Sequence, residues 1–183
     1  MRIIGGKYKG RQVHAPKGLP VRPTTDQAKE GLFNILRHRM LLGGARVLDC
    51  FAGTGNMSYE FLSRGAAHVT AVDRHPGCLR FIRTQFAILA PDRGHTVKSD
   101  VLRFLQKDSG VYDIIFLDPP YAMAGQAELV ATCFRRNLLR EGGWLILEHA
   151  TREDHGPSPY FVELRRYGSS AFSIYQYPDS AEA

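Results

Sequence analysis

Hydrophobic residues follow two different periods along this chain, and from residue 45 onward the periods alternate. Short apolar runs rich in β-branched residues predict buried strands, and apolar residues three or four positions apart predict helices. The predicted strands cover residues 46–51, 68–73, 96–99, 112–117 and 144–148. The predicted helices cover residues 56–64, 76–89, 101–106 and 126–139. This alternation predicts an α/β fold, with a mostly parallel sheet covered by helices on both faces.

The two ends of the chain depart from this alternation. Residues 24–42 carry apolar positions at helical spacing, with Thr24 or Thr25 as the cap and Gly43-Gly44 as the stop signal. Near the other end, residues 161–167 and 171–177 are strand-like runs separated by a Gly-Ser-Ser turn. We expect these runs to form an antiparallel hairpin at one edge of the sheet. A chain of 183 residues has room for one core and a short extension.

Charge is distributed unevenly along the chain. The first 25 residues hold six of the 24 basic residues and no acidic one, which accounts for the net charge of +6 and leaves 18 basic against 18 acidic residues. A basic excess at one end predicts contact with RNA, although an exposed tail that happens to be basic is the alternative. We therefore divide the chain into a basic N-terminal hairpin or arm, residues 1–23, and a domain, residues 24–183. The candidate RNA-binding residues are Arg2, Lys7, Lys9, Arg11, Lys17 and Arg22.

The most informative motif follows the strand predicted at residues 112–117. It reads Asp118-Pro119-Pro120-Tyr121, and open α/β sheets bind their ligands at this end of a strand. Because proline has no N–H, the turn offers carbonyl oxygens beside a carboxylate and an aromatic ring. Such a site accepts hydrogen bonds from an amino group and stacks on the ring that bears it. A stiff turn with a surface tyrosine is the simpler alternative.

A glycine turn follows the first predicted strand. Asp49 precedes it, Phe51, Ala52, Gly53 and Gly55 form it, and a predicted helix begins directly afterwards. The dinucleotide fingerprint wants Gly or Ala three residues after Gly55, where Ser58 stands. An acid would also repel a phosphate and suit a cation. The turn therefore favours S-adenosylmethionine, which carries a sulfonium and an ammonium and no phosphate, over a nicotinamide dinucleotide.

Two further acids follow the next two predicted strands. Asp73 ends the strand at residues 68–73, where a carboxylate can accept both hydroxyls of a ribose. Asp100 follows the strand at residues 96–99, and its carboxylate can accept an adenine amino group while the N–H of Val101 faces a ring nitrogen. Each acid alone could be a helix cap or a solvated turn. Acids at the ends of successive strands indicate a cofactor site.

These motifs in this order resemble the class I S-adenosylmethionine-dependent methyltransferases that modify exocyclic amino groups. Segments near the beginning resemble the RsmD family of bacterial small-subunit rRNA guanine-N2 methyltransferases, and they cover residues 2–6, 9–11, 22–26, 32–36 and 62–66. The resemblance is strong to about Tyr121 and loose afterwards. It implies a Rossmann-like sheet of seven strands whose last strand is antiparallel. It also implies methylation of one guanine in small-subunit (16S) rRNA.

The resemblance carries further expectations for single residues. Residues 22–34 should fold over the cofactor, with Thr25 near its methionine end. Gln27 and Lys29 stand where the family usually has arginines, and residues 56–58, Asn-Met-Ser, replace a common small-apolar sequence. These departures affect RNA contacts or cofactor packing and leave the amine site intact. We expect an enzyme that acts on rRNA within an assembling 30S particle, as a monomer.

The chemistry expected at the amine site is methyl transfer to nitrogen. Asp118 and the carbonyl of Pro119 would each accept one N–H of the amine, and Tyr121 would stack on the base. An adenine-N6 methyltransferase acting on DNA or RNA would use the same site, so the motif alone does not select guanine. A nicotinamide oxidoreductase would leave the Pro-Pro motif unexplained, and a non-catalytic RNA-binding module would need none of the three cofactor acids.

Several classes of protein are disfavoured by the sequence. Cys50, Cys78 and Cys133 are widely spaced, which indicates reduced thiols, and no Cys/His spacing indicates zinc or another metal. There is no apolar run long enough to cross a membrane and no signal-peptide pattern at the start. We therefore expect a cytoplasmic protein without a metal site and without membrane contact.

Overall fold

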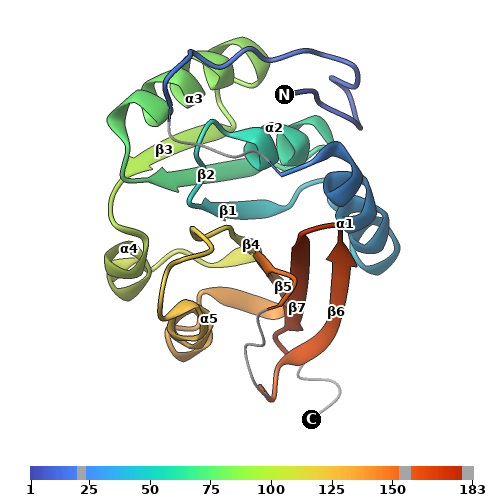
Figure 1. Ribbon diagram of the computed structural model, residues 1–183, viewed down its shortest axis with the longest axis vertical. Coiled ribbons are helices and arrows are strands. Elements are labelled where there is room, and N and C mark those ends of the chain that lie inside the picture. Colours follow the sequence, from blue (N-terminus) through green and yellow to red (C-terminus); the bar gives the residue numbers. More distant parts are fainter. Residues whose placement is uncertain (20–23, 153–157, 179–183) are drawn as a thin grey trace.

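The computed structural model describes residues 1–19, 24–152 and 158–178, which form a seven-stranded mixed sheet with helices on both faces (Figure 1). The strand order is β3-β2-β1-β4-β5-β7-β6, with β7 antiparallel to both of its neighbours. This confirms the predicted α/β class and the antiparallel hairpin at one edge. The strands are β1 (Arg46–Cys50), β2 (His68–Asp73), β3 (Gly94–Lys98), β4 (Tyr112–Leu117), β5 (Leu139–Ala150), β6 (Phe161–Tyr167) and β7 (Ser170–Gln176). The helices are α1 (Asp26–Arg39), α2 (Asn56–Ser63), α3 (Pro76–Leu89), α4 (Val101–Lys107) and α5 (Gln126–Arg135).

The core has two parts, one on each face of the sheet. Helices α1, α2 and α3 cover one face, where Leu32, Phe61 and Ile82 belong to the same buried cluster as Ile114 and Phe116 of the central strand β4. Helices α4 and α5 cover the other face, and Figure 1 shows them on the side of the sheet away from α1. All six residues of β4 are buried because the strand is covered on both faces. The residues that follow β4 are therefore held by a rigid central strand.

Three element boundaries differ by three residues or more from those predicted by the hydrophobic pattern, and the other differences are one or two residues. Helix α1 ends at Arg39 and helix α5 at Arg135, earlier than predicted, and β5 begins at Leu139, earlier than the predicted residue 144. Tyr112 pairs with Leu139 but Ile114 pairs with Trp144, so β5 contains a bulge at Gly142-Gly143. Gly142-Gly143 therefore lies within β5, whereas the pattern predicted a strand that begins after this pair.

The N-terminal residues fold back on themselves and lie against α2. Arg2 and Gln12 form an antiparallel bridge, and the side chains of Ile3 and Val13 are buried in the core. The buried carboxylate of Glu60 on α2 accepts hydrogen bonds from the backbone N–H groups of Ile4 and Gly5. In Figure 1 this segment, in blue, runs along α2 and the end of α3. The division into an arm and a domain at residue 23 stays a prediction.

Candidate functional site

The predicted site residues meet at the carboxyl ends of the parallel strands. Cys50 of β1 pairs with Leu117 of β4, and Leu117 pairs with Leu147 of β5. The next residues along β4 and β5 are Asp118 and Glu148, so these two acids lie side by side. Side chains alternate between the faces of a sheet, which places both acids on the face covered by α1 and α2. The site is therefore built on three adjacent strands.

The Asp118-Pro119-Pro120-Tyr121 turn is held by hydrogen bonds at both ends. The N–H of Asp118 donates to the carbonyl of Cys50 at 3.3 Å, and the carbonyl of Pro120 accepts from the N–H of Met123 at 2.8 Å. The hydroxyls of Tyr121 and Ser170, the first residue of β7, share a hydrogen bond of 2.6 Å. The tyrosine ring is thus tethered at its far end and cannot swing freely.

Asp118 lies in an environment that disfavours its charge. Burial raises the pKa of its carboxyl well above the usual range, and the neighbouring carboxylates of Glu148 and Asp49 raise it further. Acids this close are costly to ionise together unless positive charge or hydrogen-bond donors reach them. The site is therefore suited to a ligand that brings cationic groups or N–H donors.

Glu148 is a site residue that the sequence analysis missed. Its side chain is 3% exposed, and its Oε2 accepts a hydrogen bond from Thr24 Oγ1 at 2.7 Å. A period of two along β5 places it on the same face as Trp144 and Ile146, where a third apolar residue is expected. An acid at an apolar position at the end of a predicted central strand was the signal that could have revealed it.

The glycine turn after β1 has the geometry of a close-approach loop. Phe51, Gly53 and Gly55 have positive φ values of 61°, 54° and 84°, and Gly55 caps α2. A side chain at Gly55 would meet the ring of Tyr59 at 2.6 Å. Asp73 holds the turn, because its Oδ2 accepts from the N–H of Gly53 at 2.8 Å while its Oδ1 accepts from the N–H of His75. The predicted cofactor residues Gly53 and Asp73 are therefore in direct contact.

Asp49 lies below this turn and is fully enclosed by the protein. Its side chain is 1% exposed, and its Oδ2 accepts a hydrogen bond of 2.5 Å from Ser58 on α2. Burial raises the pKa of Asp49 to about 7, and the nearby carboxylate of Asp73 adds to the shift, while the Ser58 hydrogen bonds oppose it. Ser58, which departs from the dinucleotide fingerprint, thus serves the acid and not a phosphate.

We expect the stability of the free protein to depend on pH through Asp49. Its folded pKa of about 7 lies above the unfolded value of about 4, so the folded state keeps a proton that the unfolded chain has lost. The stability that the folded state gains from this bound proton is complete below the unfolded pKa of about 4 and is lost as the pH rises through 7. Between about pH 5.5 and about pH 8, wild type should lose about 2 kcal/mol relative to Asp49→Asn. Urea unfolding of both proteins measures the difference, and parallel pH curves would contradict it.

The other predicted cofactor residues lie at helix starts. Asp100 caps α4 with Oδ1, which accepts from the N–H of Arg103 at 3.0 Å, and Val101 directly after it is buried. Thr25 caps α1 through Oγ1, which accepts from the N–H of Ala28. Both capping residues are exposed. The capping interpretation is correct for both, and it leaves room for a ligand contact.

Two of the departures from the family pattern contact one another. Lys29 is buried, and its Nζ donates to the side-chain Oδ1 of Asn56 at 3.1 Å and to the carbonyl of Arg2 at 2.5 Å. Asn56 in turn donates through Nδ2 to the carbonyl of Thr24 at 3.0 Å. We use the name Lys29 clasp for the side chains of Lys29 and Asn56, the carbonyls of Arg2 and Thr24, and the Asp26 carboxylate, which lies 3.4 Å from Nζ. The clasp ties the N-terminal segment to the start of α2 and to Thr24.

The predicted RNA-binding side chains are exposed wherever the structure describes them. Arg2 pairs with Asp26 at 3.0 Å and remains about half exposed, and Lys7 lies over the ring of Tyr8. Lys9, Arg11 and Lys17 are exposed as well, whereas Arg22 lies outside the described residues.

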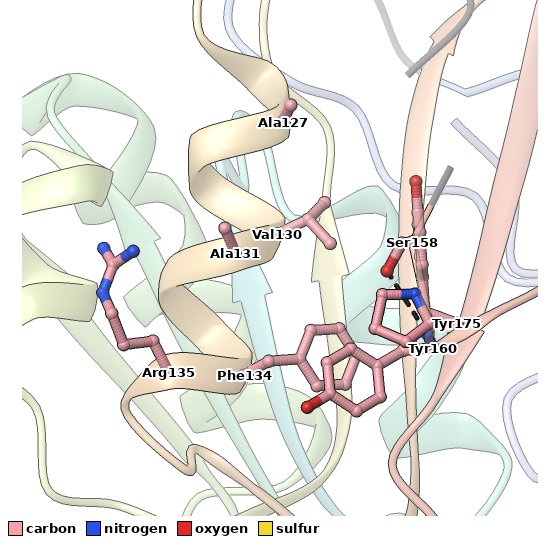
Figure 2. A pocket seen from close by; sticks show the side chains of 9 residues that line it. Ala127, Val130, Ala131, Phe134, Arg135, Ser158, Tyr160 and Tyr175 are labelled. Atoms are coloured by element: carbon pink, nitrogen blue, oxygen red, sulfur yellow. Dashed lines mark hydrogen bonds between the residues drawn. The ribbon is translucent and has the colours of Figure 1, made fainter. Parts of the chain in front are cut away.

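A separate hollow lies between α5 and the chain that enters β6. It encloses about 450 Å³, and Figure 2 shows the rings of Phe134 and Tyr160 facing each other at its floor, with a centroid distance of 4.0 Å. Arg135 points away from these rings. None of the predicted site residues lines the hollow. In the described part of the chain, no helix is long and apolar enough to cross a membrane, and no cluster of side chains could hold a metal ion.

The sheet order and the glycine turn at its carboxyl edge define a methyltransferase of the Rossmann-like class. The chain belongs to the family described as "Conserved hypothetical protein 95", whose model matches residues 1–176. It is 35% identical over 145 residues, 79% of this chain and 69% of the relative, to "Ribosomal RNA small subunit methyltransferase D" of Escherichia coli strain K12. These matches confirm the resemblance to the RsmD family.

Two relatives match over nearly their whole length. "Putative rRNA methyltransferase YlbH" of Bacillus subtilis is 34% identical, and the match covers 96% of this chain and 98% of the relative. The solved structure of "Putative methyltransferase yhhF from Escherichia coli" superposes with a TM-score of 0.85 at 29% identity, and covers 98% of this chain and 99% of that one. The similarity thus extends past Tyr121, where the sequence motifs became loose, into the edge hairpin.

Proposed function

We propose that this protein transfers a methyl group from S-adenosylmethionine to the exocyclic N2 of one guanine in small-subunit (16S) rRNA. The observation that carries the proposal is the position of Asp118-Pro119-Pro120-Tyr121 at the carboxyl end of the central strand, beside the acid-flanked glycine turn. Membership of a family that includes small-subunit rRNA methyltransferases supports the choice of substrate. Localisation in the cytoplasm is part of the same proposal.

The residues at the glycine turn fit S-adenosylmethionine. This cofactor supplies a methyl group on a positively charged sulfur, and burial together with neighbouring carboxylates raises the pKa of Asp49 and of Asp118, a shift that a nearby cation would oppose. Asp73 has further lone pairs for the two ribose hydroxyls beyond its contacts with Gly53 and His75. The adenine would lie near Asp100 and Val101, the methionine end near Thr25, and Phe51, Ala52 and Gly55 would line the path between them.

The amine site orients the nucleophile. Asp118 and the carbonyl of Pro119 would each accept one N2–H, which aims the nitrogen lone pair at the methyl group and stabilises the developing positive charge. Within the described residues no backbone N–H binds the Pro119 carbonyl, so it is available as an acceptor. The new N–CH3 bond replaces the S–CH3 bond, and one N2 proton then leaves to water. Tyr121 would stack on the extruded base, a contact of about 1–3 kcal/mol.

The basic N-terminal segment would bind the RNA backbone. Its charges lie on a segment that Glu60 and the Lys29 clasp hold against α2, so they are presented from a fixed surface. We include Arg22 with Arg2 and the lysines of this arm, which we take as residues 1–23 ahead of the methyltransferase domain at 24–183. An assembling 30S particle is the proposed substrate, and a monomer is the proposed form.

Removing charge from the arm should weaken RNA binding in a salt-dependent way. Replacing Lys7, Lys9 and Arg11 together by glutamine removes up to three phosphate contacts, so the slope of log K against log[salt] should become shallower by about 2–3. Filter binding of small-subunit rRNA at several salt concentrations measures this slope. The matched control replaces three exposed basic residues elsewhere, which are Lys98, Arg103 and Lys107. Equal slopes for the two triple variants would contradict a role for the arm.

Transfer of a labelled methyl group tests the proposed function directly. The protein is incubated with labelled S-adenosylmethionine and with rRNA that lacks the modification, and the RNA is digested to nucleosides. We expect the label in N2-methylguanosine. Label in N6-methyladenosine would replace the proposal with an adenine methyltransferase, and absence of cofactor binding would favour a non-catalytic RNA-binding module.

A further inference from the structure

Glu148 stands beside the amine site without a role in the chemistry described so far. It is next to Asp118 in the register of β4 and β5, on the same face of the sheet, and it is one of the groups that raise the pKa of Asp118. Thr24 donates a hydrogen bond to its Oε2 and so fixes the position of the carboxylate. Asp118 and Glu148 thus present two neighbouring carboxylates to a ligand beside the motif, which favours a ligand edge with two adjacent hydrogen-bond donors.

The edge of the base offers a physical reason for two adjacent carboxylates. Guanine presents N1–H next to its N2 amino group, so two neighbouring positions on this edge are hydrogen-bond donors. Adenine presents an unprotonated N1 next to its N6 amino group, so one position is an acceptor. A single carboxylate that binds the amino group fits both bases, whereas a second carboxylate opposite N1 fits guanine and repels adenine.

We propose that Glu148 selects guanine by accepting a hydrogen bond from N1–H while Asp118 accepts one from the N2 amino group. This inference rests on the proposed function and adds the residue that chooses the base. The Glu148 carboxylate offers about four lone-pair positions, so it can accept N1–H in addition to the hydroxyl of Thr24. The hydrogen bond from the neutral Thr24 hydroxyl orients the carboxylate, and the carboxylate oxygens repel any base that presents a lone pair at N1.

Base analogues test this role in the unmodified protein. 2-Aminopurine keeps the N2 amino group but lacks the proton on N1, so it presents an acceptor to Glu148. The target guanine, once mapped, is replaced by 2-aminopurine in a synthetic rRNA fragment, and kcat/KM is measured for both RNAs. We expect guanine to be preferred by at least about tenfold, the usual size of one well-placed base contact. Equal kcat/KM values for both RNAs would overturn the proposal.

The variant Glu148→Gln separates this preference from the different reactivities of the two bases. The glutamine amide can donate to the N1 of 2-aminopurine, so kcat/KM on that RNA should rise or hold steady. On guanine RNA it should fall by about tenfold or more, because a charged acceptor is lost. The preference of Glu148→Gln for guanine RNA over 2-aminopurine RNA should therefore be lost. Glu141→Gln on the same strand is the matched control, since Glu141 is exposed at the opposite end of β5, and its preference should equal that of wild type.

A merely structural role for Glu148 predicts a different result. Loss of packing would lower kcat/KM on both RNAs by the same factor, and that outcome overturns the proposal. Binding of S-adenosylmethionine by calorimetry and the Tm should stay close to wild type in Glu148→Gln. If that variant does not fold, Thr24→Val removes the hydrogen bond that orients Glu148, and the preference for guanine should still fall several-fold; an unchanged preference overturns the proposal.

The inference and the proposed function fail in distinguishable ways. If wild type places no methyl group on N2 of guanine, the proposed function is wrong. If wild type forms N2-methylguanosine but Glu148→Gln keeps the full preference for guanine over 2-aminopurine, only the role of Glu148 is wrong.

Discussion

Asp118→Ala is expected to lower methyl transfer to rRNA by about 10²–10³-fold, the usual cost of removing one preorganised group from a reacting centre. Asp118 is the acid at the end of the central strand, and its N–H is fixed to the carbonyl of Cys50. Without its carboxylate, the amino group keeps one acceptor at Pro119 and is free to rotate. Single-turnover rates with saturating cofactor and RNA measure the loss.

The same variant should bind S-adenosylmethionine within about threefold of wild type, because the proposed role of Asp118 is toward the base. Asp92→Ala removes an exposed carboxylate from another part of the surface and serves as the control, with unchanged turnover expected. If Asp118→Ala keeps most of the wild-type rate, Asp118 is not the group that orients the amine.

Asp73→Ala is expected to weaken the binding of S-adenosylmethionine by about 100-fold. Two hydrogen bonds from ribose hydroxyls to a charged acceptor would be lost, at about 1.5 kcal/mol or more each. The glycine turn would also lose the contact that now fixes the N–H of Gly53. Calorimetric titration of the cofactor measures Kd directly, without RNA and without turnover.

Two other variants serve as comparisons for the cofactor Kd of Asp73→Ala. Asp73→Asn keeps one acceptor oxygen and should lie between alanine and wild type. Asp100→Ala should have a smaller effect, because Asp100 is an exposed helix cap with one contact proposed to the adenine. An equal loss for the alanine variants at 73 and 100 would argue against a special role for Asp73.

The sequence predicted the elements best where several local signals agreed. The bounds of β2, α3, β4 and β6 are the predicted ones, to the residue. Helix α3 has a proline in its first turn and His75 as its cap, and β4 is an unbroken apolar run from Ile114 to Leu117. Helix α5 was predicted too long because its last turn ends before Asn137, whose φ of 53° breaks the helix. The apolar Leu138 and Leu139 kept the helical spacing, although they belong to the next connection and strand.

The hydrophobic pattern could not predict contacts between residues that are far apart in the sequence. The partner of Glu148 is Thr24, 124 positions away, and local spacing carries no information about that pair. The motif at 118–121 could be interpreted as an amine site from the sequence alone, because the hydrogen-bonding groups of proline and aspartate follow from their identity. The proposed choice of guanine over adenine rests on Glu148 lying next to that motif in the sheet, and finding this neighbour requires strand order and register.

The Lys29 clasp also limits which amino-acid substitutions this protein can accept. Lysine at 29 and asparagine at 56 are a matched donor and acceptor, and the carbonyls of Arg2 and Thr24 complete the match. A guanidinium is larger and flatter than an ammonium, so arginine at 29 would need different partners in the same enclosed space. We therefore expect substitutions at positions 29 and 56 to be tolerated together and not singly. A chimera that joins this N-terminal half to the α2 of a relative must exchange both residues or neither.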